Sequence, residues 1–301
     1  MRTSVFSWFS PPFDEYNVAQ SAAVPFLDKD VNMVVSFSTA VGKTVLAECA
    51  FAYHLATDQD CRVAYVCPFR SLAAEKYREW KEGHFGRYGV VLGTGDTNAG
   101  LEEFMASRLA LVTNESFDSK TRLGRWSQWI GSLSCVVFDE AHLMSIKGRG
   151  GALEASMMRF SGQRPEARLV LLSATMSNAM DVARWVKSLN GKPTKCVTSS
   201  WKPAVIVTEV EDVEGIEAKI KRAAELAKSE SDRKVVVFVH SKVTGAEIVK
   251  RLRKVGVRSA FHNASLAPSR RRRLEEMFND RESGLNVLVS TSTLGSGVNI
   301  G

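Results

Sequence analysis

The stretch that decides the fold runs from Val31 to Thr44 and reads VNMVVSFSTAVGKT. Its first half is a largely apolar run rich in β-branched residues, which predicts a buried strand over Val31–Phe37. A short turn then leads into a helical pattern over Thr44–Leu55. Backbone N–H groups at such a strand-to-helix turn form a cradle for phosphate oxygens. We therefore expect a nucleotide-binding phosphate loop made of Thr39, Ala40, Val41, Gly42, Lys43 and Thr44.

Three positions of this loop have distinct predicted roles. Gly42 allows the backbone to approach a phosphate closely, and Lys43 is long enough to reach the β- and γ-phosphates during catalysis. Thr44 offers its hydroxyl to Mg²⁺. The general pattern has Gly where this chain has Phe37, so the match is partial. The position of the motif at a strand-to-helix turn favours the functional interpretation over a chance match.

A second cluster, DEAH at residues 139–142, directly follows the apolar run Cys135–Phe138. A carboxylate at the end of a strand can hold a metal ion, and a neighbouring carboxylate can take a proton from water. We predict that Asp139 anchors the metal and that Glu140 is the general base. We also expect the strand that carries them to be a neighbour of the strand before the phosphate loop.

A third cluster, SAT at residues 173–175, follows the expected strand Arg168–Leu172. Unaided hydroxyls are poor nucleophiles, and no G-x-S-x-G turn is present to activate Ser173. We expect Ser173 and Thr175 to couple the site to the rest of the domain through a hydrogen bond to the DEAH segment. Capping of a helix N-terminus is the alternative role for either hydroxyl.

Apolar strands alternate with helical patterns along the chain, which predicts an α/β fold with parallel sheets covered on both faces. Two of the expected elements are a single helix over Ser116–Ile130 and a strand over Ala204–Thr208. The pattern lapses near Thr198–Pro203, so we expect one domain over residues 1–200 and a second over residues 201–301. Further strands are expected at 62–67, 89–92, 109–113, 134–138, 235–239, 259–262 and 286–290.

The composition favours a polyanionic partner. Lys and Arg number 40 against 33 Asp and Glu, which gives a net charge of +7 and a pI of about 9.2. The five cysteines are scattered without C-x-x-C spacing, which argues against a disulfide framework or a zinc site. No apolar run is long enough to span a membrane, and Met1–Phe9 lacks a signal-peptide pattern. We expect an intracellular protein that does not associate with membranes.

The three clusters, in this order, resemble those of superfamily 2 helicases, and the DEAH form resembles the superkiller-like DExH branch. The resemblance implies two tandem RecA-like domains, ATP and Mg²⁺ as cofactors, and ATP-driven movement in the 3′-to-5′ direction along a nucleic-acid strand. It also implies that His142 lies at the catalytic cleft. The chain stops at Gly301, before the arginine-rich motif that completes the family's ATP site. We therefore expect a second domain that is incomplete, the front portion of a longer protein or a natural truncation, and weak activity of this chain.

Shorter segments extend the resemblance. Residues 13–20 resemble the adenine-reading Q motif, and PFRSLA at 68–73, TGD at 94–96 and TNE at 113–115 resemble strand-contacting motifs. In the second half, VFVHSK at 237–242, AFHNASL at 260–266 and STSTLGSGVN at 290–299 resemble later helicase motifs, with Lys242, Asn263 and Ser265 as departures. The segments imply nucleotide contacts at Gln20, Gly297 and Asn299, and nucleic-acid backbone contacts at Arg70, Ser71, Thr113, Ser241 and Thr291.

Several alternatives remain open on the sequence. Trp126 and Trp129 fit a packed apolar face better than a base-stacking platform. The run Arg270–Arg273 fits a solvated helix face better than a phosphate-binding patch. A different phosphate-loop enzyme and a non-catalytic nucleic-acid-binding module are the competing functions. Contacts to phosphates do not distinguish DNA from RNA or a single strand from a partial duplex, because they do not report the 2′-hydroxyl.

Overall fold

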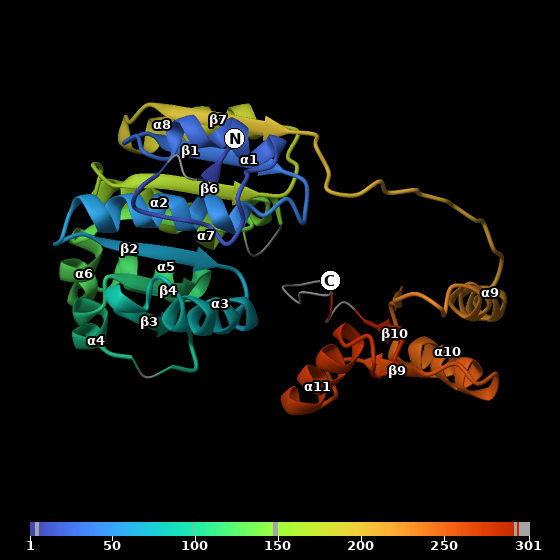
Figure 1. Ribbon diagram of the computed structural model, residues 1–301. Coiled ribbons are helices and arrows are strands. Elements are labelled where there is room, and N and C mark those ends of the chain that lie inside the picture. The colour runs from blue at the N-terminus through green and yellow to red at the C-terminus, as the bar shows by residue number, and fades with distance from the viewer. Residues whose placement is uncertain (4–5, 98, 147–149, 292–293, 295–301) are drawn as a thin grey trace. The chain divides into compact units, whose positions relative to one another are not determined.

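A computed structural model describes residues 1–3, 6–97, 99–146, 150–291 and 294 (Figure 1). The chain forms two compact units, Met1–Ile206 (unit 1) and Val207–Gly301 (unit 2). Each unit has its own parallel sheet, so the α/β prediction is confirmed for both.

Unit 1 is built on a seven-stranded parallel sheet in the order β3-β4-β2-β5-β6-β1-β7. Its strands are β1 (Asn32–Phe37), β2 (Arg62–Cys67), β3 (Val90–Gly93), β4 (Leu109–Thr113), β5 (Leu133–Phe138), β6 (Arg168–Ser173) and β7 (Thr194–Ser199). Its helices are α1 (Val18–Ala23), α2 (Lys43–Thr57), α3 (Arg70–Glu82), α4 (Leu101–Ala106), α5 (Asn114–Arg122), α6 (Ser127–Gly131), α7 (Gly150–Gln163) and α8 (Ala179–Asn190). Short 3₁₀ turns cover Val24–Phe26, Gly86–Tyr88, Gly124–Trp126 and Ala141–Ser145.

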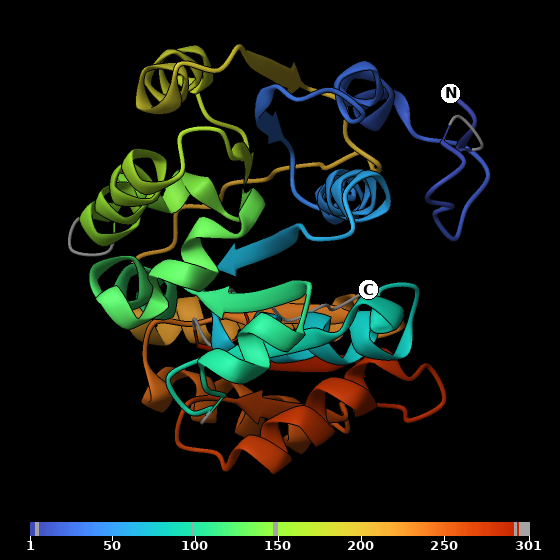
Figure 2. The ribbon, with the colours of Figure 1, turned by 90° about the vertical axis from the view of Figure 1, so that its left-hand side faces the viewer.

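Helices cover both faces of this sheet, with α1 and α2 on one side and α7 and α8 on the other (Figure 2). The side chains of strand β1 contribute to both faces. Met33, Val35 and Phe37 pack in the apolar cluster on the α2 side, whereas Val34 packs in the cluster on the α7 side. Alternate side chains of a strand point to opposite faces, so a strand covered on both sides is apolar along most of its length. This is why the continuous apolar runs predicted these strands well.

Unit 2 contains a three-stranded parallel sheet in the order β8-β10-β9 within the described residues. Strand β10 pairs with β8 and with β9 in register, for example Val289 with Val237 and with Phe261. The strands are β8 (Val235–Phe238), β9 (Ser259–His262) and β10 (Val287–Ser290), and the helices are α9 (Ile216–Ser229), α10 (Lys242–Lys254) and α11 (Pro268–Asn279).

Two expected elements are wrong. The segment Ala204–Thr208 is not a strand, because its β-branched side chains have no sheet partner and Val205 is 94% exposed. The helix expected over Ser116–Ile130 is broken after Arg122, where Leu123 is extended and Gly124 begins a 3₁₀ turn. Glycine weakens a helix, and the break allows Trp126 and Trp129 to pack into the core. The packed interpretation of these tryptophans is therefore confirmed.

The expected pairing of the phosphate-loop strand with the DEAH strand is also wrong. Strand β6 lies between β1 and β5, pairing with both. Strand order is set by crossover connections rather than by local pattern, so it could not be predicted from the motifs. The strand β7, which pairs with β1, was not expected at all.

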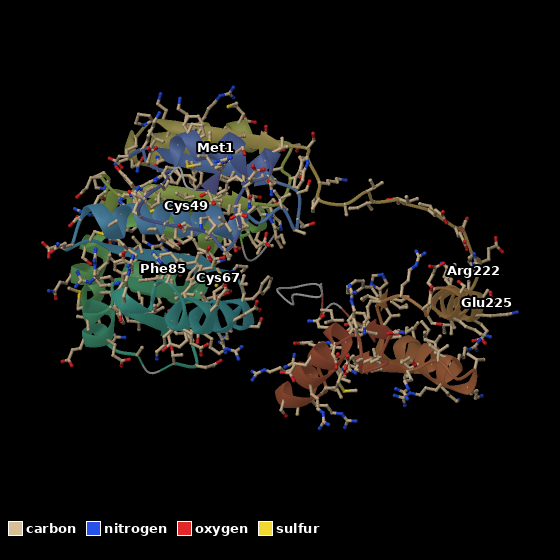
Figure 3. The ribbon with its side chains drawn as sticks, viewed as in Figure 1. Met1, Cys49, Cys67, Phe85, Arg222 and Glu225 are labelled. Atoms are coloured by element: carbon tan, nitrogen blue, oxygen red, sulfur yellow. The ribbon has the colours of Figure 1, made fainter. Side chains whose placement is uncertain are left out.

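All five cysteines are free thiols in the structure. Four of them are buried, and Cys49 and Cys67 lie within unit 1 (Figure 3). Burial raises the pKa of Cys67 to about 12, so this thiol is unreactive at neutral pH. The structure therefore confirms that these residues serve packing.

Candidate functional site

The three sequence clusters meet at one edge of the unit 1 sheet. Strands β5, β6 and β1 are consecutive and parallel, so their carboxyl ends lie side by side. The phosphate loop follows β1, Ser173 ends β6, and the DEAH segment follows β5. Ligand sites of open α/β sheets form outside the carboxyl ends of the strands.

The phosphate loop has the backbone conformation of a tight anion cradle. Gly42 has φ +82° at the start of α2, and Ala40 has φ +61°, a region that non-glycine residues rarely adopt. A Cβ on Gly42 would lie 2.7 Å from Gln20 Nε2. Glycine is therefore required at position 42 for both its conformation and its close contact.

Gln20 lies against this loop. Its Nε2 donates to the carbonyls of Val41 (3.2 Å) and Gly42 (3.1 Å), and its Oε1 accepts from the N–H of Asn17 at 3.1 Å. The neighbouring Asn17 Nδ2 also donates to the Val41 carbonyl at 2.9 Å. In the structure, the predicted adenine-reading residue is thus a buried support of the phosphate loop.

Lys43 folds back over its own loop. Its Nζ donates to the carbonyls of Ser38 (3.1 Å) and Phe37 (3.4 Å). Burial lowers the pKa of Lys43, and the charges of Glu140 and Asp139 oppose this effect. The lysine and both carboxylates are therefore close enough to interact electrostatically, although they are about a hundred residues apart in sequence.

Asp139 is buried and held from two sides. One carboxylate oxygen accepts from the Tyr65 hydroxyl, and the other accepts from the Glu140 N–H at 2.8 Å. Burial raises the pKa of Asp139, whereas these two hydrogen bonds and the charge of Lys43 lower it. Two fixed donors leave lone pairs of the carboxylate free for another ligand.

Glu140 has a left-handed backbone with φ +52°. Burial and the adjacent charge of Asp139 both raise its pKa. Its Oε2 lies 3.3 Å from Nδ1 of His142, yet neither atom has the geometry of a hydrogen bond to any described residue. A strained backbone and unpartnered buried polar atoms are typical of functional sites.

Ser173 and Thr175 do not make the expected hydrogen bond to the DEAH segment. The Ser173 hydroxyl is buried without a hydrogen-bond partner among the described residues, and Thr175 is exposed. Ser36 of β1 instead joins this segment to the strand before the phosphate loop: its Oγ donates to the Ala174 carbonyl (3.3 Å) and accepts from the Met176 N–H (2.8 Å). A serine inside an otherwise apolar buried strand was the available sequence signal.

A groove of about 860 Å³ gathers three predicted nucleic-acid-binding residues of unit 1. Arg70, Ser71 and Thr113 all line it, at the N-termini of α3 and α5. Thr113 is buried, and its hydroxyl caps α5 by accepting from the Ser116 N–H at 3.3 Å. Arg70 is exposed and pairs with both carboxylate oxygens of Asp96 at 2.6 Å.

The same groove contains basic residues that the sequence analysis missed, Lys120 and Arg125. Lys120 Nζ lies 4.2 Å from the centre of the Trp126 ring and donates to Ser116 Oγ at 3.0 Å. Burial and the charge of Arg125 lower the pKa of Lys120 to about 8. Their only sequence signal was their position on the predicted helix that carries Trp126.

In unit 2, Ser241 caps α10 by accepting from the Thr244 N–H at 3.0 Å. The Thr291 N–H, at the end of β10, donates to the His262 carbonyl of β9 at 3.3 Å. The structure therefore positions these two predicted contact residues near the carboxyl ends of the sheet strands. Gly297 and Asn299, the other predicted contacts, lie outside the described residues.

Among the described helices, none combines the length and apolar content that a bilayer crossing requires. The described residues also contain no group of three or more His, Cys, Asp or Glu side chains suited to hold a metal ion.

Comparison with known proteins agrees with this architecture. The chain is 28% identical over 312 residues to the "ATP-dependent DNA helicase Hel308" of Pyrococcus abyssi, which covers 89% of this chain and 41% of the relative. The chain thus spans about two fifths of that relative's length. It is 31% identical over 197 residues to the Hel308 of Methanocaldococcus jannaschii, covering 64% of this chain and 16% of the relative.

Solved structures share the fold. The Mycobacterium smegmatis helicase Lhr, solved with single-stranded DNA and AMP-PNP, superposes with a TM-score of 0.71 at 23% identity, over 98% of this chain and 42% of Lhr. The DUF1998 helicase MrfA, solved with DNA and AMPPNP, superposes with a TM-score of 0.75 at 21% identity, over 96% of this chain and 43% of MrfA. The expected fold of two tandem RecA-like domains is confirmed.

Two family models match the chain in tandem. The DEAD/DEAH box helicase model matches residues 17–182, and the model of the helicase conserved C-terminal domain matches residues 218–301. The first match contains the phosphate loop, the DEAH segment and the groove with Arg70 and Thr113. The chain therefore belongs to the DEAD/DEAH box helicases.

Proposed function

We propose that this chain is the ATP-binding motor of a nucleic-acid-dependent ATPase and helicase of the superkiller-like branch. Residues 1–200 would form the ATP-binding domain, and residues 201–301 would form part of the second RecA-like domain. The single observation that carries the proposal is the electrostatic proximity of Lys43 to Asp139 and Glu140 at one sheet edge. A cation and two carboxylates around an anion cradle are what hydrolysis of a nucleoside triphosphate requires.

The residues at this edge fit a Mg²⁺ ion. Magnesium prefers oxygen ligands, keeps several waters and needs only one or two carboxylates beside substrate phosphates. Asp139 offers a fixed carboxylate with free lone pairs, and Thr44 offers a hydroxyl in the first turn of α2. We propose that these two residues hold the ion, which would neutralise negative charge on the phosphate oxygens.

Glu140 is our proposed general base. Its Oε2 is a buried acceptor with no donor among the described residues, so it is free to accept a proton from water. Burial and Asp139 raise its pKa, which makes the ionised carboxylate a better proton acceptor. His142, whose Nδ1 lies 3.3 Å from this oxygen, would hold the carboxylate in position.

We propose that the groove of unit 1 holds the backbone of a nucleic-acid strand. Arg70, Lys120 and Arg125 supply positive charge, and Ser71 and Ser116 supply hydroxyls. Such groups hold phosphates without reading bases, so binding should be independent of sequence and sensitive to salt. The 3′-to-5′ direction is proposed from the resemblance to the superkiller-like branch, and the residues leave DNA and RNA equally open as partners.

The proposal is tested by measuring ATP hydrolysis of the full chain with and without a single-stranded oligonucleotide. We expect a low rate of ATP hydrolysis that the oligonucleotide stimulates. Lys43→Ala should abolish this activity, and Lys187→Ala, on the exposed face of α8, should retain it. Equal turnover of the wild type and Lys43→Ala would contradict the proposal. If the strand binds without any such turnover, the chain is a non-catalytic nucleic-acid-binding module instead.

A further inference from the structure

Strand β9 has an open side in unit 2. It pairs with β10 alone among the described strands. Because the His262 carbonyl accepts from Thr291 at the end of β10, His262 faces β10, and Phe261 directs its backbone groups to the opposite side. The carbonyl of Ser259 also faces that side, where Arg253 donates to it at 3.1 Å. Exposed strand edges are templates for pairing with another chain.

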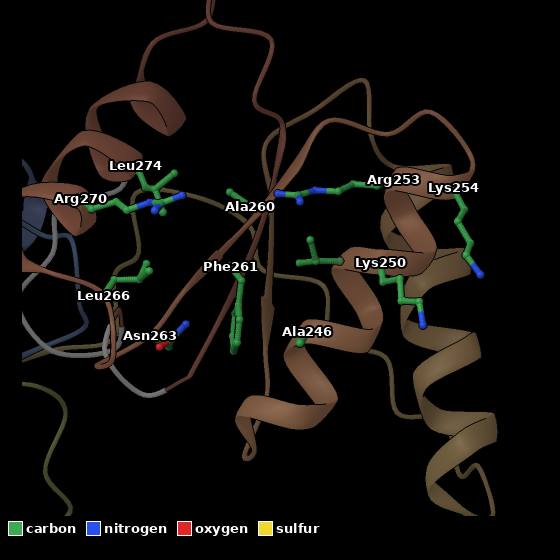
Figure 4. A pocket seen from close by; sticks show the side chains of 11 residues that line it. Ala246, Lys250, Arg253, Lys254, Ala260, Phe261, Asn263, Leu266, Arg270 and Leu274 are labelled. Carbon is green, nitrogen blue, oxygen red and sulfur yellow. The ribbon is translucent and has the colours of Figure 1, made fainter.

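Two cavities of about 700 and 580 Å³ follow this side of β9. They share Arg253, Ala260 and Leu274, so they lie next to each other, and together they are here called the β9 groove. Helix α10 forms one wall and α11 the other (Figure 4). Its apolar lining includes Val249, Ala260, Phe261, Leu266, Leu274 and Met277.

The polar lining of the β9 groove is strongly basic. Two guanidiniums, those of Arg253 on α10 and Arg270 on α11, point toward each other across Ala260 (Figure 4). No Asp or Glu side chain is among the described residues that line either cavity. Of the run Arg270–Arg273, only Arg270 lines the groove, whereas Arg272 and Arg273 are exposed on the solvated face of α11. The five cationic lining residues are Lys250, Arg253, Lys254, Arg258 and Arg270.

We propose that the β9 groove binds an extended acidic peptide segment of a partner protein, added as a further strand beside β9. Main-chain hydrogen bonds to the backbone groups of Phe261 would supply affinity, since the Ser259 carbonyl already accepts from Arg253, and alternate apolar side chains would fill the cavities. Carboxylates of the segment would face Arg253 and Arg270, which supplies charge complementarity. A nucleic-acid strand would use the cations but neither the strand edge nor the apolar floor, so the combination favours a peptide. This inference does not depend on the proposed ATPase function.

The experiment measures binding to the full chain by fluorescence anisotropy. The probe is a short labelled peptide of alternating Glu and Val residues. Its three comparators are the same peptide with Lys in place of Glu, the same peptide N-methylated along one edge, and a short oligothymidine. We expect the Glu–Val peptide to bind and the Lys–Val peptide not to bind. N-methylation should abolish binding because it removes the backbone N–H groups that the peptide would donate to β9.

Charge reversal at matched positions localises the site. Arg270→Glu should weaken peptide binding about tenfold or more, whereas Arg272→Glu, two residues further along α11 and outside the groove, should change it less than about twofold. Equal losses in the two variants, or full binding of the N-methylated peptide, would overturn the proposal. Displacement of the peptide from the groove by oligothymidine at comparable concentration would overturn it in favour of a general polyanion site. ATP hydrolysis should be the same in both variants, which separates this test from that of the proposed function.

Discussion

The two units bury their sheets to different extents. In unit 1, β1 and β6 are buried along their whole length between two helical layers. In unit 2, every residue of β8 is at least partly exposed, and Phe238 at its end is 61% exposed. The apolar clusters of unit 2 are also smaller. Unit 1 thus has a sheet covered on both faces beside the candidate site, whereas the described part of unit 2 has a smaller core, from which we expect a lower stability.

Removing a buried cation should test this difference most strongly. Arg168 of β6 is fully buried and donates to the carbonyls of Val31 (2.9 Å), Leu27 (2.8 Å) and Phe26 (2.7 Å). Arg168→Met leaves these carbonyls unpaired, so we expect a loss of about 3 kcal/mol or more from the free energy of unfolding of unit 1. Urea unfolding monitored by tryptophan fluorescence measures this loss.

The matched substitution in unit 2 is Arg253→Met, since Arg253 is exposed and serves one carbonyl, that of Ser259. We expect a much smaller loss there, and we expect unit 2 of the wild type to unfold at lower urea than unit 1. A single transition, or equal losses for the two variants, would contradict the comparison.

The stability of unit 1 should also depend on pH. Burial raises the pKa of Glu48 in α2 to about 7, and Trp80 Nε1 donates to its carboxyl at 2.8 Å. The unfolded chain loses this proton near pH 4.5, so the stability of unit 1 should fall as pH rises from about 4.5 to about 7 and stay lower above that range. The contribution amounts to about 3 kcal/mol.

Glu48→Gln keeps an acceptor for Trp80 without the charge, so it should remove this dependence and raise stability above pH 7. Urea unfolding at about pH 5 and about pH 8 measures the difference. The control is Glu154→Gln on the exposed face of α7, which should leave the profile unchanged. The same profile for Glu48→Gln and the wild type would show that this carboxyl is not buried as described.

Two glycines with positive φ, one in the phosphate loop and one in unit 2, should differ in their effect on ATP binding. Gly42→Ala forces a Cβ to within 2.7 Å of Gln20 Nε2, so we expect it to lower ATP affinity by about tenfold or more, because it displaces the loop amides. Gly256 of unit 2 has φ +81° with open space around it. Gly256→Ala should cost only about 1 kcal/mol of stability, the usual cost of a left-handed backbone. Isothermal titration with ATP distinguishes the two, and an equal affinity for both variants would contradict our account of the loop.

The smallest effect concerns the groove of unit 1. Asp96 holds Arg70 in an exposed ion pair, and such pairs contribute little to stability. Asp96→Asn should free Arg70 and raise affinity for a single-stranded oligonucleotide about threefold at low salt, with the gain lost at high salt. In unit 2, Lys242 bonds to the neutral Ser265 Oγ at 2.5 Å, so Ser265→Ala should change affinity little. Fluorescence anisotropy titrations with the oligonucleotide at two salt concentrations measure the affinities of both variants.

The fold could be predicted wherever burial alone fixed the pattern. Strands Arg62–Cys67 and Leu109–Thr113 were predicted to the residue, because an apolar run covered on both faces carries a clear signal. The segment Ala204–Thr208 carries a similar signal but meets no partner strand. The β7 edge strand Thr194–Ser199 was missed because only Val197 of its residues is buried.

The residues of the candidate site could be predicted from the sequence, but the strand order and the hydrogen bonds that link them could not. Local motifs identified Lys43, Asp139 and Glu140, since each follows a strand in a recognisable pattern. The insertion of β6 between their strands and the link through Ser36 depend on tertiary contacts that no local pattern records. Lys120 was missed for the same reason, because its place in the groove depends on the packing of Trp126.

The most direct measurement of our central claim is the affinity of the full chain for ATP with and without Mg²⁺, by isothermal titration, in the wild type, Lys43→Ala, Asp139→Asn and Lys187→Ala. We predict that Mg²⁺ raises the affinity of the wild type and of Lys187→Ala, that Asp139→Asn loses this gain, and that Lys43→Ala binds ATP weakly under both conditions. Equal affinity of the wild type and Lys43→Ala, or an undiminished Mg²⁺ gain in Asp139→Asn, would contradict the claim that these residues form one ATP site.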